Sequence, residues 1–330
     1  MADKPLLEVK DLVIHYETDD GVVKALNGVN IHIGVGETLG LVGETGAGKT
    51  TLAKGIMRLI PNPPGKILGG EVIFEGQDLL KLSTNGMEAI RGRDISMIFQ
   101  DSMTSLNPVL TIGRQLEETI SVHSSLSKDE IKKQALDILT KVGVSSPEQR
   151  LKEFPHQLSG GMRQRVMIAM ALSCSPSLLI ADEPTTALDV TIQAQIIDLM
   201  VELKKNINAS IILITHDMGV VAEMADYIMV MYAGKVMEYG SARQIFKEAM
   251  HPYTQGLLAS IPRLDKDLDR LFSIDGTVPS LDRMPKGCRF CARCLQAMDK
   301  CREHQPPVYI TDDGHKVSCW KYENLKEEKV

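Results

Sequence analysis

The chain lacks any apolar run of the roughly 18 to 20 residues that a membrane-spanning helix needs. Its first residues, MADKPLLEVK, contain no hydrophobic signal core. We therefore expect it to stay in the cytosol unless another protein docks it to a membrane. It also lacks an excess of positive charge, since 37 lysines and arginines stand against 43 aspartates and glutamates and the net charge is −6. Because the chain has no excess of positive charge that would hold a polyanion, we do not expect nucleic acid to be a main partner.

Cysteines are also few, six in 330 residues. The remaining composition, 43% hydrophobic and 24% charged, is close to that of an average globular protein. It excludes wholesale disorder, a collagen-like repeat and a coiled-coil rod. A chain of this length has room for two domains, or for one large domain with an appendage.

The order of apolar segments predicts an α/β fold. Short apolar runs, among them ETLGLVG, PSLLIAD and ASIILITH, alternate with helix-length stretches, as in a largely parallel sheet covered by helices. The opening segment alternates apolar and polar residues and predicts antiparallel strands beside that sheet. We expect a core over residues 1–240, a helical subdomain at 83–157 within it, and a C-terminal extension over 241–330.

A complete phosphate-binding motif follows the apolar strand TLGLV. It reads GETGAGKT, with the pattern G-x-x-x-x-G-K-[ST], and a helical stretch that begins with Thr51 follows it. Glycines allow backbone N–H groups to curl around a phosphate, Lys49 reaches the β and γ phosphates, and the Thr50 hydroxyl can bind Mg²⁺. The predicted nucleotide-binding residues of this loop are Gly43, Glu44, Thr45, Gly46, Ala47, Gly48, Lys49, Thr50 and Thr51.

Two adjacent carboxylates end the apolar run LLIADE. Asp182 is placed to hold Mg²⁺ through a water molecule, and Glu183 to polarise the water that attacks the γ phosphorus. Standing alone, such a pair would be no more than the start of a turn. The P-loop earlier in the chain favours the catalytic interpretation.

A second glycine-containing helix start occurs at LSGGMRQ. Ser159, Gly160 and Gly161 offer a hydroxyl and backbone N–H groups to an anion, although SGG alone is a plain helix cap. Together with GETGAGKT and LLIADE, this run resembles the signature of the ATP-binding cassette (ABC) ATPases, from about residue 7 to residue 240. The resemblance implies a P-loop ABC ATPase core with an antiparallel β subdomain and an inserted helical subdomain.

The resemblance also implies roles for four further residues. Gln100 in MIFQD resembles the glutamine that senses Mg²⁺, and His216 the switch histidine that contacts the γ phosphate and the catalytic water. Asp189 in TTALD matches a loop that crosses to a second subunit. Tyr16 matches the aromatic residue that stacks on adenine, with a core-strand tyrosine as the alternative.

In related cassettes the signature of one subunit faces the P-loop of another, so that ATP lies between two chains. One chain supplies one of each, so the resemblance implies a dimer, with a second copy or with a related ATPase subunit. ATP closes the pair and hydrolysis reopens it, as a ligand-driven population shift.

Two runs, SLNPVLTIGRQL and HPYTQGLLASIPRL, resemble the ATPase subunits of dipeptide and oligopeptide permeases. This implies a peptide importer with two transmembrane permease subunits, an extracytoplasmic peptide-binding protein, and a location on the cytoplasmic side of the membrane. The alternatives are a nickel-type or other small-solute importer of the same subgroup, a soluble non-transport ABC ATPase, and an iron–sulfur electron carrier that ATP regulates.

Five of the six cysteines lie between Cys288 and Cys319. In a reducing cytosol such a cluster indicates metal ligation rather than disulfides. The run GCRFCARCLQA resembles the tail of the same subgroup, G-C-x-F-x-x-R-C-x-x-A, where some members hold a [4Fe–4S] cluster. The implied ligands are Cys288, Cys294, Cys301 and Cys319, while Cys291 is extra and could compete. Structural Zn²⁺ and unligated thiols are the alternatives.

Overall fold

The structure is a computed structural model that describes residues 4–19, 21–100, 105–185, 189–207, 209–261, 273–280 and 284–328. It forms two compact units. The first contains residues 1–33, 38–80 and 215–330, and the second contains residues 34–37 and 81–214. Among the helices so described, none has the length and hydropathy of a membrane-spanning segment.

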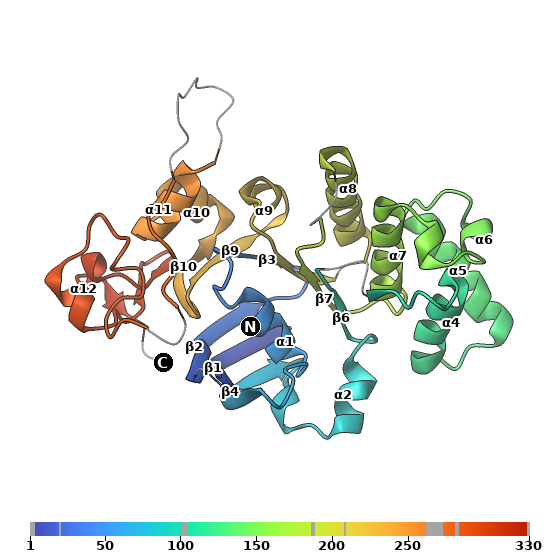
Figure 1. Cartoon of the computed structure of the whole chain (residues 1–330), viewed down its shortest axis with the longest axis horizontal. Coiled ribbons are helices and arrows are strands. Elements are labelled where there is room, and N and C mark those ends of the chain that lie inside the picture. Colours follow the sequence, from blue (N-terminus) through green and yellow to red (C-terminus); the bar gives the residue numbers. More distant parts are fainter. Residues whose placement is uncertain are drawn as a thin grey trace. The chain divides into compact units, whose positions relative to one another are not determined.

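An antiparallel sheet in the first unit is built from the opening segment, as expected. Its strands run in the order β2 (Gly21–Ile33), β1 (Leu7–Thr18), β4 (Gly65–Phe74) and β5 (Gln77–Asp78) (Figure 1). Leu7 and Val9 of β1 are buried, because alternate side chains of a strand face the same side, and a register shift between Val9 and Leu12 puts Leu12 and Ile14 among the buried residues as well. A 3-10 turn, η1 (Leu79–Lys81), follows β5.

The first unit also holds part of the central sheet. Here β3 (Thr38–Val42) runs parallel to β9 (Tyr227–Tyr232), and β10 (Lys235–Ser241) pairs with β9 antiparallel. The helices of this unit are α1 (Lys49–Ile56), α9 (Met218–Met224), α10 (Ala242–Glu248), α11 (Pro252–Ala259) and α12 (Asp299–Glu303).

The C-terminal segment extends this sheet with three two-residue strands, in the order β10, β12 (Lys316–Val317), β11 (Tyr309–Ile310) and β13 (Lys326–Glu327). A short turn, η3 (Trp320–Tyr322), precedes β13.

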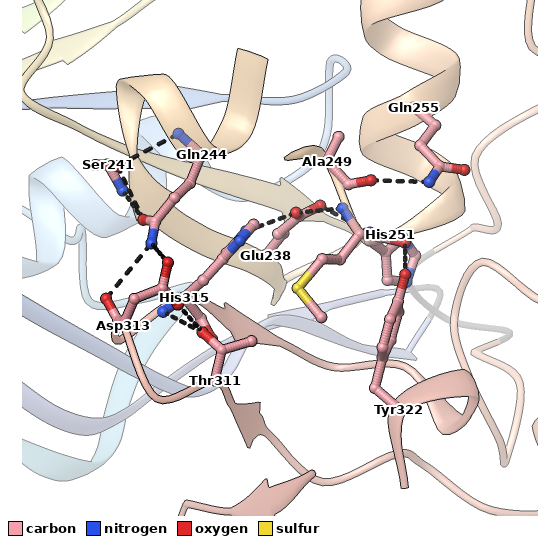
Figure 2. A network of polar contacts seen from close by, with 11 residues as sticks. Glu238, Ser241, Gln244, Ala249, His251, Gln255, Thr311, Asp313, His315 and Tyr322 are labelled. Atoms are coloured by element: carbon pink, nitrogen blue, oxygen red, sulfur yellow. Dashed lines mark hydrogen bonds and ion pairs between the residues drawn. The ribbon is translucent and has the colours of Figure 1, made fainter. Parts of the chain in front are cut away.

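Glu238 of β10 is fully buried and joins the C-terminal segment to the core (Figure 2). Its Oε1 lies 2.8 Å from Nε2 of His315 and accepts the N–H of Met250 at 2.7 Å, while Oε2 accepts the N–H of His251 at 2.9 Å. One carboxylate therefore ties together β10, the start of α11 and the segment before β12.

The second unit contains three parallel strands, β6 (Ile95–Ile98), β7 (Leu178–Asp182) and β8 (Ser210–Ile214), with β7 between the other two. All residues of β7 and β8 are buried, which explains their continuous apolar sequence. The helices and 3-10 turns are α2 (Thr84–Ile90), α4 (Ile112–His123), α5 (Lys128–Lys141), α6 (Pro147–Arg150), η2 (Pro155–Gln157), α7 (Gly160–Leu172) and α8 (Val190–Ile207).

Helices α4, α5, α6 and α7 form one group in this unit (Figure 1). Ser127 begins α5 with a capping box, in which Glu130 accepts the N–H of Ser127 at 2.8 Å. The buried α5 residues Ile131, Ala135 and Ile138 recur at helical spacing. The predicted boundaries at residue 240 and at 83–157 stay predictions.

Candidate functional site

The P-loop connects β3 to α1 in the first unit, and its glycines are required by its backbone. Gly43, Gly46 and Gly48 have φ values of 148°, 82° and 99°, which lie in the left-handed region. A Cβ atom on Gly48 would lie 2.9 Å from the carbonyl oxygen of Ala25. Glycine is therefore needed at this position both for its conformation and for the close approach of the neighbouring strand.

Lys49 is the first residue of α1 and is buried, with 7% of its surface exposed. Its Nζ donates to the carbonyl oxygens of Gly43 at 2.7 Å and Glu44 at 3.2 Å, so the ammonium group lies under the loop. The first turn of α1 contains no acidic residue. Its N–H groups and dipole therefore favour an anion.

The other predicted nucleotide-binding residues of the first unit differ in exposure. Thr45 and Gly46 at the tip of the loop are exposed, and Ala47 is buried. The N–H of Gly234, in the β9–β10 turn, donates to the Ala47 carbonyl at 2.9 Å. Tyr16 is half-buried on β1, where it pairs with Val23 and Gly65 of the neighbouring strands.

The P-loop also receives contacts from residues that sequence reasoning did not assign to the site. The N–H of Glu44 donates to Oη of Tyr253 at 2.9 Å, and Arg293 forms an ion pair with the Glu44 carboxylate. Both partners belong to runs that the resemblance singled out, HPYT and GCRFCARC, although that resemblance gave them no role at the nucleotide.

In the second unit, Asp182 and Glu183 lie at the carboxyl end of β7. Asp182 is 2% exposed. Glu183 has a φ of 47°, a left-handed conformation that costs a non-glycine residue about 1 to 3 kcal/mol and is common at functional sites. Its N–H donates to the carbonyl oxygen of Ile214 at 2.8 Å, and its Oε2 accepts Nε2–H of Gln100 at 2.7 Å. The structure thus brings Gln100 and Glu183 together, and the hydrogen bond from Gln100 fixes the orientation of the Glu183 carboxylate.

The signature run forms the start of α7. Ser159 is the N-cap, with its Oγ accepting the N–H of Met162 at 3.3 Å. A Cβ on Gly161 would lie 2.7 Å from Cγ2 of Ile192 on α8, so glycine permits this helix packing. Asp189 caps α8, because its Oδ1 accepts the N–H of Ile192 at 3.0 Å.

Parts of two sequence runs named above are not described by the structure. Thr186 to Leu188 of TTALD, and the residues from Pro262 onward in the HPYT run, lie outside the described residues. His216 follows β8, belongs to the first unit and has an exposed side chain. The assigned roles of all these residues stay predictions.

The five cysteines of the tail line one pocket, together with aromatic and aliphatic side chains that include Phe290 and Trp320. Cys288, Cys301 and Cys319 are buried, while Cys291 and Cys294 are half-buried. Burial raises the pKa of Cys288 to about 12 and also raises that of Cys294 and Cys319, which are therefore neutral thiols at pH 7. In the described part of the chain, no three histidine, cysteine or acidic side chains converge as a metal site would require. The expected metal-binding character of this region is therefore not shown.

Two family models match the chain. One, described as ABC transporter, matches residues 26–186, and the other, described as oligopeptide/dipeptide transporter, C-terminal region, matches residues 237–301. The oligopeptide transport ATP-binding protein OppD of Bacillus subtilis strain 168 is 53% identical over 96% of this chain and 88% of its own length. The dipeptide transport ATP-binding protein DppD of the same strain is 50% identical over 98% of this chain and 97% of its own.

Solved structures agree with this result. The ATP-binding cassette MJ0796, in a dimeric post-hydrolysis state bound to ADP and Pi, superimposes with a TM-score of 0.64 at 29% identity. The match covers 72% of this chain and 99% of that one. The cassette cbiO1 of Clostridium perfringens, part of the cbiONQ transporter complex, gives a TM-score of 0.62 at 30% identity, over 74% of this chain and 91% of that one.

Proposed function

The chain belongs to the ABC transporter family of ATP-binding proteins, with the C-terminal region of oligopeptide and dipeptide transporters, and from that premise we propose that it hydrolyses ATP to drive peptide import. It is an ATPase that uses ATP and Mg²⁺. The observation that carries the proposal is the P-loop itself, with Lys49 held beneath a glycine-rich turn at the start of α1. The peptide substrate is supported by relatives that transport oligopeptides and dipeptides and are about half identical over nearly the whole chain.

We assign the chemistry to two groups of residues. Backbone N–H groups from Gly43 to Thr51 bind the phosphates, Lys49 contacts the β and γ phosphates, and Tyr16 stacks on adenine. Thr50, Gln100 and Asp182 hold Mg²⁺, directly or through water. Glu183 is the general base that polarises the attacking water, and His216 contacts the γ phosphate. The hydrogen bond from Gln100 supports this role for Glu183, because it orients the carboxylate.

The signature residues act on the nucleotide of a second subunit. Ser159, Gly160 and Gly161 offer the start of α7 to the γ phosphate bound by the partner, and Asp189 lies at the same junction. The partner is a second copy or a related ATPase subunit. The dimer is bound at the cytoplasmic side of the membrane to two transmembrane permease subunits, which receive peptide from an extracytoplasmic peptide-binding protein.

The test is co-purification of the full chain with multi-span permease proteins, followed by ATP-driven peptide uptake into vesicles. Uptake of labelled peptide that needs ATP supports the proposal. Lys49→Ala removes the ammonium group of the P-loop and is the control variant that should lose ATP-driven uptake. Uptake of nickel rather than peptide would favour the alternative importer, and ATPase activity without any permease partner would favour a non-transport ATPase.

We further propose that Cys288, Cys294, Cys301 and Cys319 hold a [4Fe–4S] cluster, with Zn²⁺ as the alternative. All four cysteines line one pocket, and thiolates are the ligands that both groups take, but no three of the described side chains are grouped there as a metal site would require; Cys291 lines the same pocket as an additional thiol. Bound there, such a group would cross-link segments of a tail whose strands are only two residues long, because metal-binding energy is folding energy. Metal analysis of anaerobically purified protein distinguishes iron with sulfide from zinc.

A further inference from the structure

Glu44 places a negative charge in a loop that is built to bind phosphate. It is the second residue of GETGAGKT, and its side chain is 30% exposed. An unpaired carboxylate here would repel a polyanion, with an energy that grows as water is excluded by the bound nucleotide. The loop therefore requires something that offsets the charge.

Arg293 supplies the opposite charge from the cysteine-rich tail, 249 positions away. Its Nη1 donates to Oε1 and Oε2 of Glu44 at 3.0 and 2.9 Å, and its side chain is only 6% exposed. Two backbone carbonyls fix the guanidinium from the other side: Nε donates to Asp275 at 2.9 Å and Nη2 to Ile274 at 3.1 Å. A guanidinium anchored in this way reaches Glu44 with little loss of conformational entropy.

Tyr253 holds the backbone of the same residue. It is the tyrosine of the HPYT run, is fully buried, and accepts the Glu44 N–H with its hydroxyl oxygen at 2.9 Å. Its ring packs edge-on against Tyr232 with a centroid distance of 4.7 Å, and it lies 5.2 Å from the ring of Phe290. The Tyr232 hydroxyl lies 3.3 Å from Nη1 of Arg293, so the two supports of Glu44 share one aromatic cluster.

We propose that Arg293 and Tyr253 are positioning residues of the nucleotide site, which hold Glu44 and so set the charge and shape of the P-loop for ATP. Arg293 neutralises the carboxylate, and Tyr253 fixes the amide that begins the turn. Neither residue belongs to the nucleotide-binding motifs. The C-terminal region therefore supports a site whose nucleotide-binding residues all lie in other parts of the chain. This inference rests on ATP binding by the P-loop.

The test is a double-mutant cycle on Arg293 and Glu44 in the purified full chain. Binding of a fluorescent ATP analogue with Mg²⁺ gives Kd, and steady-state hydrolysis gives KM and kcat. Arg293→Met leaves Glu44 unpaired, and we expect it to weaken binding about tenfold, the equivalent of about 1.4 kcal/mol, with the larger effect on KM. Adding Glu44→Gln to Arg293→Met removes the unpaired charge and should recover most of that factor.

Recovery is the result that separates charge neutralisation from a structural role, since damaged packing would not be repaired by removing a carboxylate. The loss in Arg293→Met should also shrink as salt is raised, because screening weakens the repulsion. Arg302→Met, an exposed arginine on α12 of the same tail, is the matched control and should bind ATP like the wild type.

Two further variants keep the test decisive if Arg293→Met does not fold. Arg293→Lys retains the positive charge and should bind ATP more tightly than Arg293→Met. If Arg293→Met does not fold, the Kd of Arg293→Lys should lie within a few-fold of the wild-type value. Tyr253→Phe removes one oxygen atom without changing the ring and should weaken binding several-fold.

The inference is overturned if folded Arg293→Met binds ATP as the wild type does, or if the double variant is as weak as the single one. It is also overturned if Tyr253→Phe leaves Kd unchanged, or if Arg293→Lys binds as weakly as Arg293→Met. A wild-type chain that does not bind ATP would instead refute the proposed function.

Discussion

The buried carboxylate of Glu238 gives the sharpest prediction about stability. Glu238→Ala removes the acceptor of two backbone N–H groups, those of Met250 and His251, and the partner of the His315 imidazole. Glu238 has no exposed surface and His315 is 3% exposed, so water cannot replace the lost partner. Each buried polar group that is left without its hydrogen-bond partner costs about 1 to 3 kcal/mol, so the loss of three partners should cost about 4 kcal/mol or more.

The loss should appear first in the C-terminal segment, because Glu238 connects that segment to β10. Trp320 is the single tryptophan of the chain and packs in the cluster formed by Tyr309, Val317 and Cys319, so its fluorescence reports unfolding of this region. With a urea dependence of about 2 kcal/mol per M, the Trp320 transition should shift down by roughly 2 M.

A surface substitution in the same region is the control. Glu303→Ala removes a side chain that is 75% exposed and should leave the transition within experimental error of the wild type. If the midpoint of Glu238→Ala moves no further than that of Glu303→Ala, the hydrogen bonds of Glu238 in Figure 2 do not stabilise the C-terminal segment.

Three other predictions follow from the two candidate sites. Glu183→Gln should bind ATP, stop hydrolysis and trap a dimer, measured by phosphate release and by gel filtration with ATP; retention of most of the hydrolysis rate would remove Glu183 from the catalytic role. Gly48→Ala forces alanine into a left-handed conformation, which costs about 1 to 3 kcal/mol, and should therefore weaken ATP binding. Gly69→Ala is the control and should bind ATP normally, because a Cβ atom at Gly69 meets nothing within 4 Å. Equal ATP binding by both variants would contradict the role of the turn. Protein purified without oxygen should be brown and contain iron, and Cys319→Ala should lose both while Cys174→Ala keeps them; colourless protein with stoichiometric zinc would contradict the cluster.

The sequence was sufficient for the motifs whose chemistry is local. GETGAGKT lies between a buried strand and a helix as predicted, and the carboxylates of LLIADE end a buried strand. The antiparallel opening strands were also predicted correctly, since apolar and polar residues alternate in short stretches of both strands, although register shifts interrupt the alternation in β1.

Contacts between distant segments could not be predicted in the same way. The β12–β10 pairing involves strands of two residues, which are too short to show periodicity. The Arg293–Glu44 ion pair joins two charged residues far apart in the chain, and either would be read as solvated without the fold. Resemblance singled out HPYT and GCRFCARC but did not indicate that both contact the P-loop.

The ion pair between Arg293 and Glu44 has a consequence for protein synthesis. A ribosome completes Glu44 long before Arg293 emerges, so the nascent phosphate-binding loop carries an uncompensated carboxylate until the cysteine-rich region has been translated and folded. Truncated products that end before Arg293 should then bind nucleotide more weakly than the finished chain.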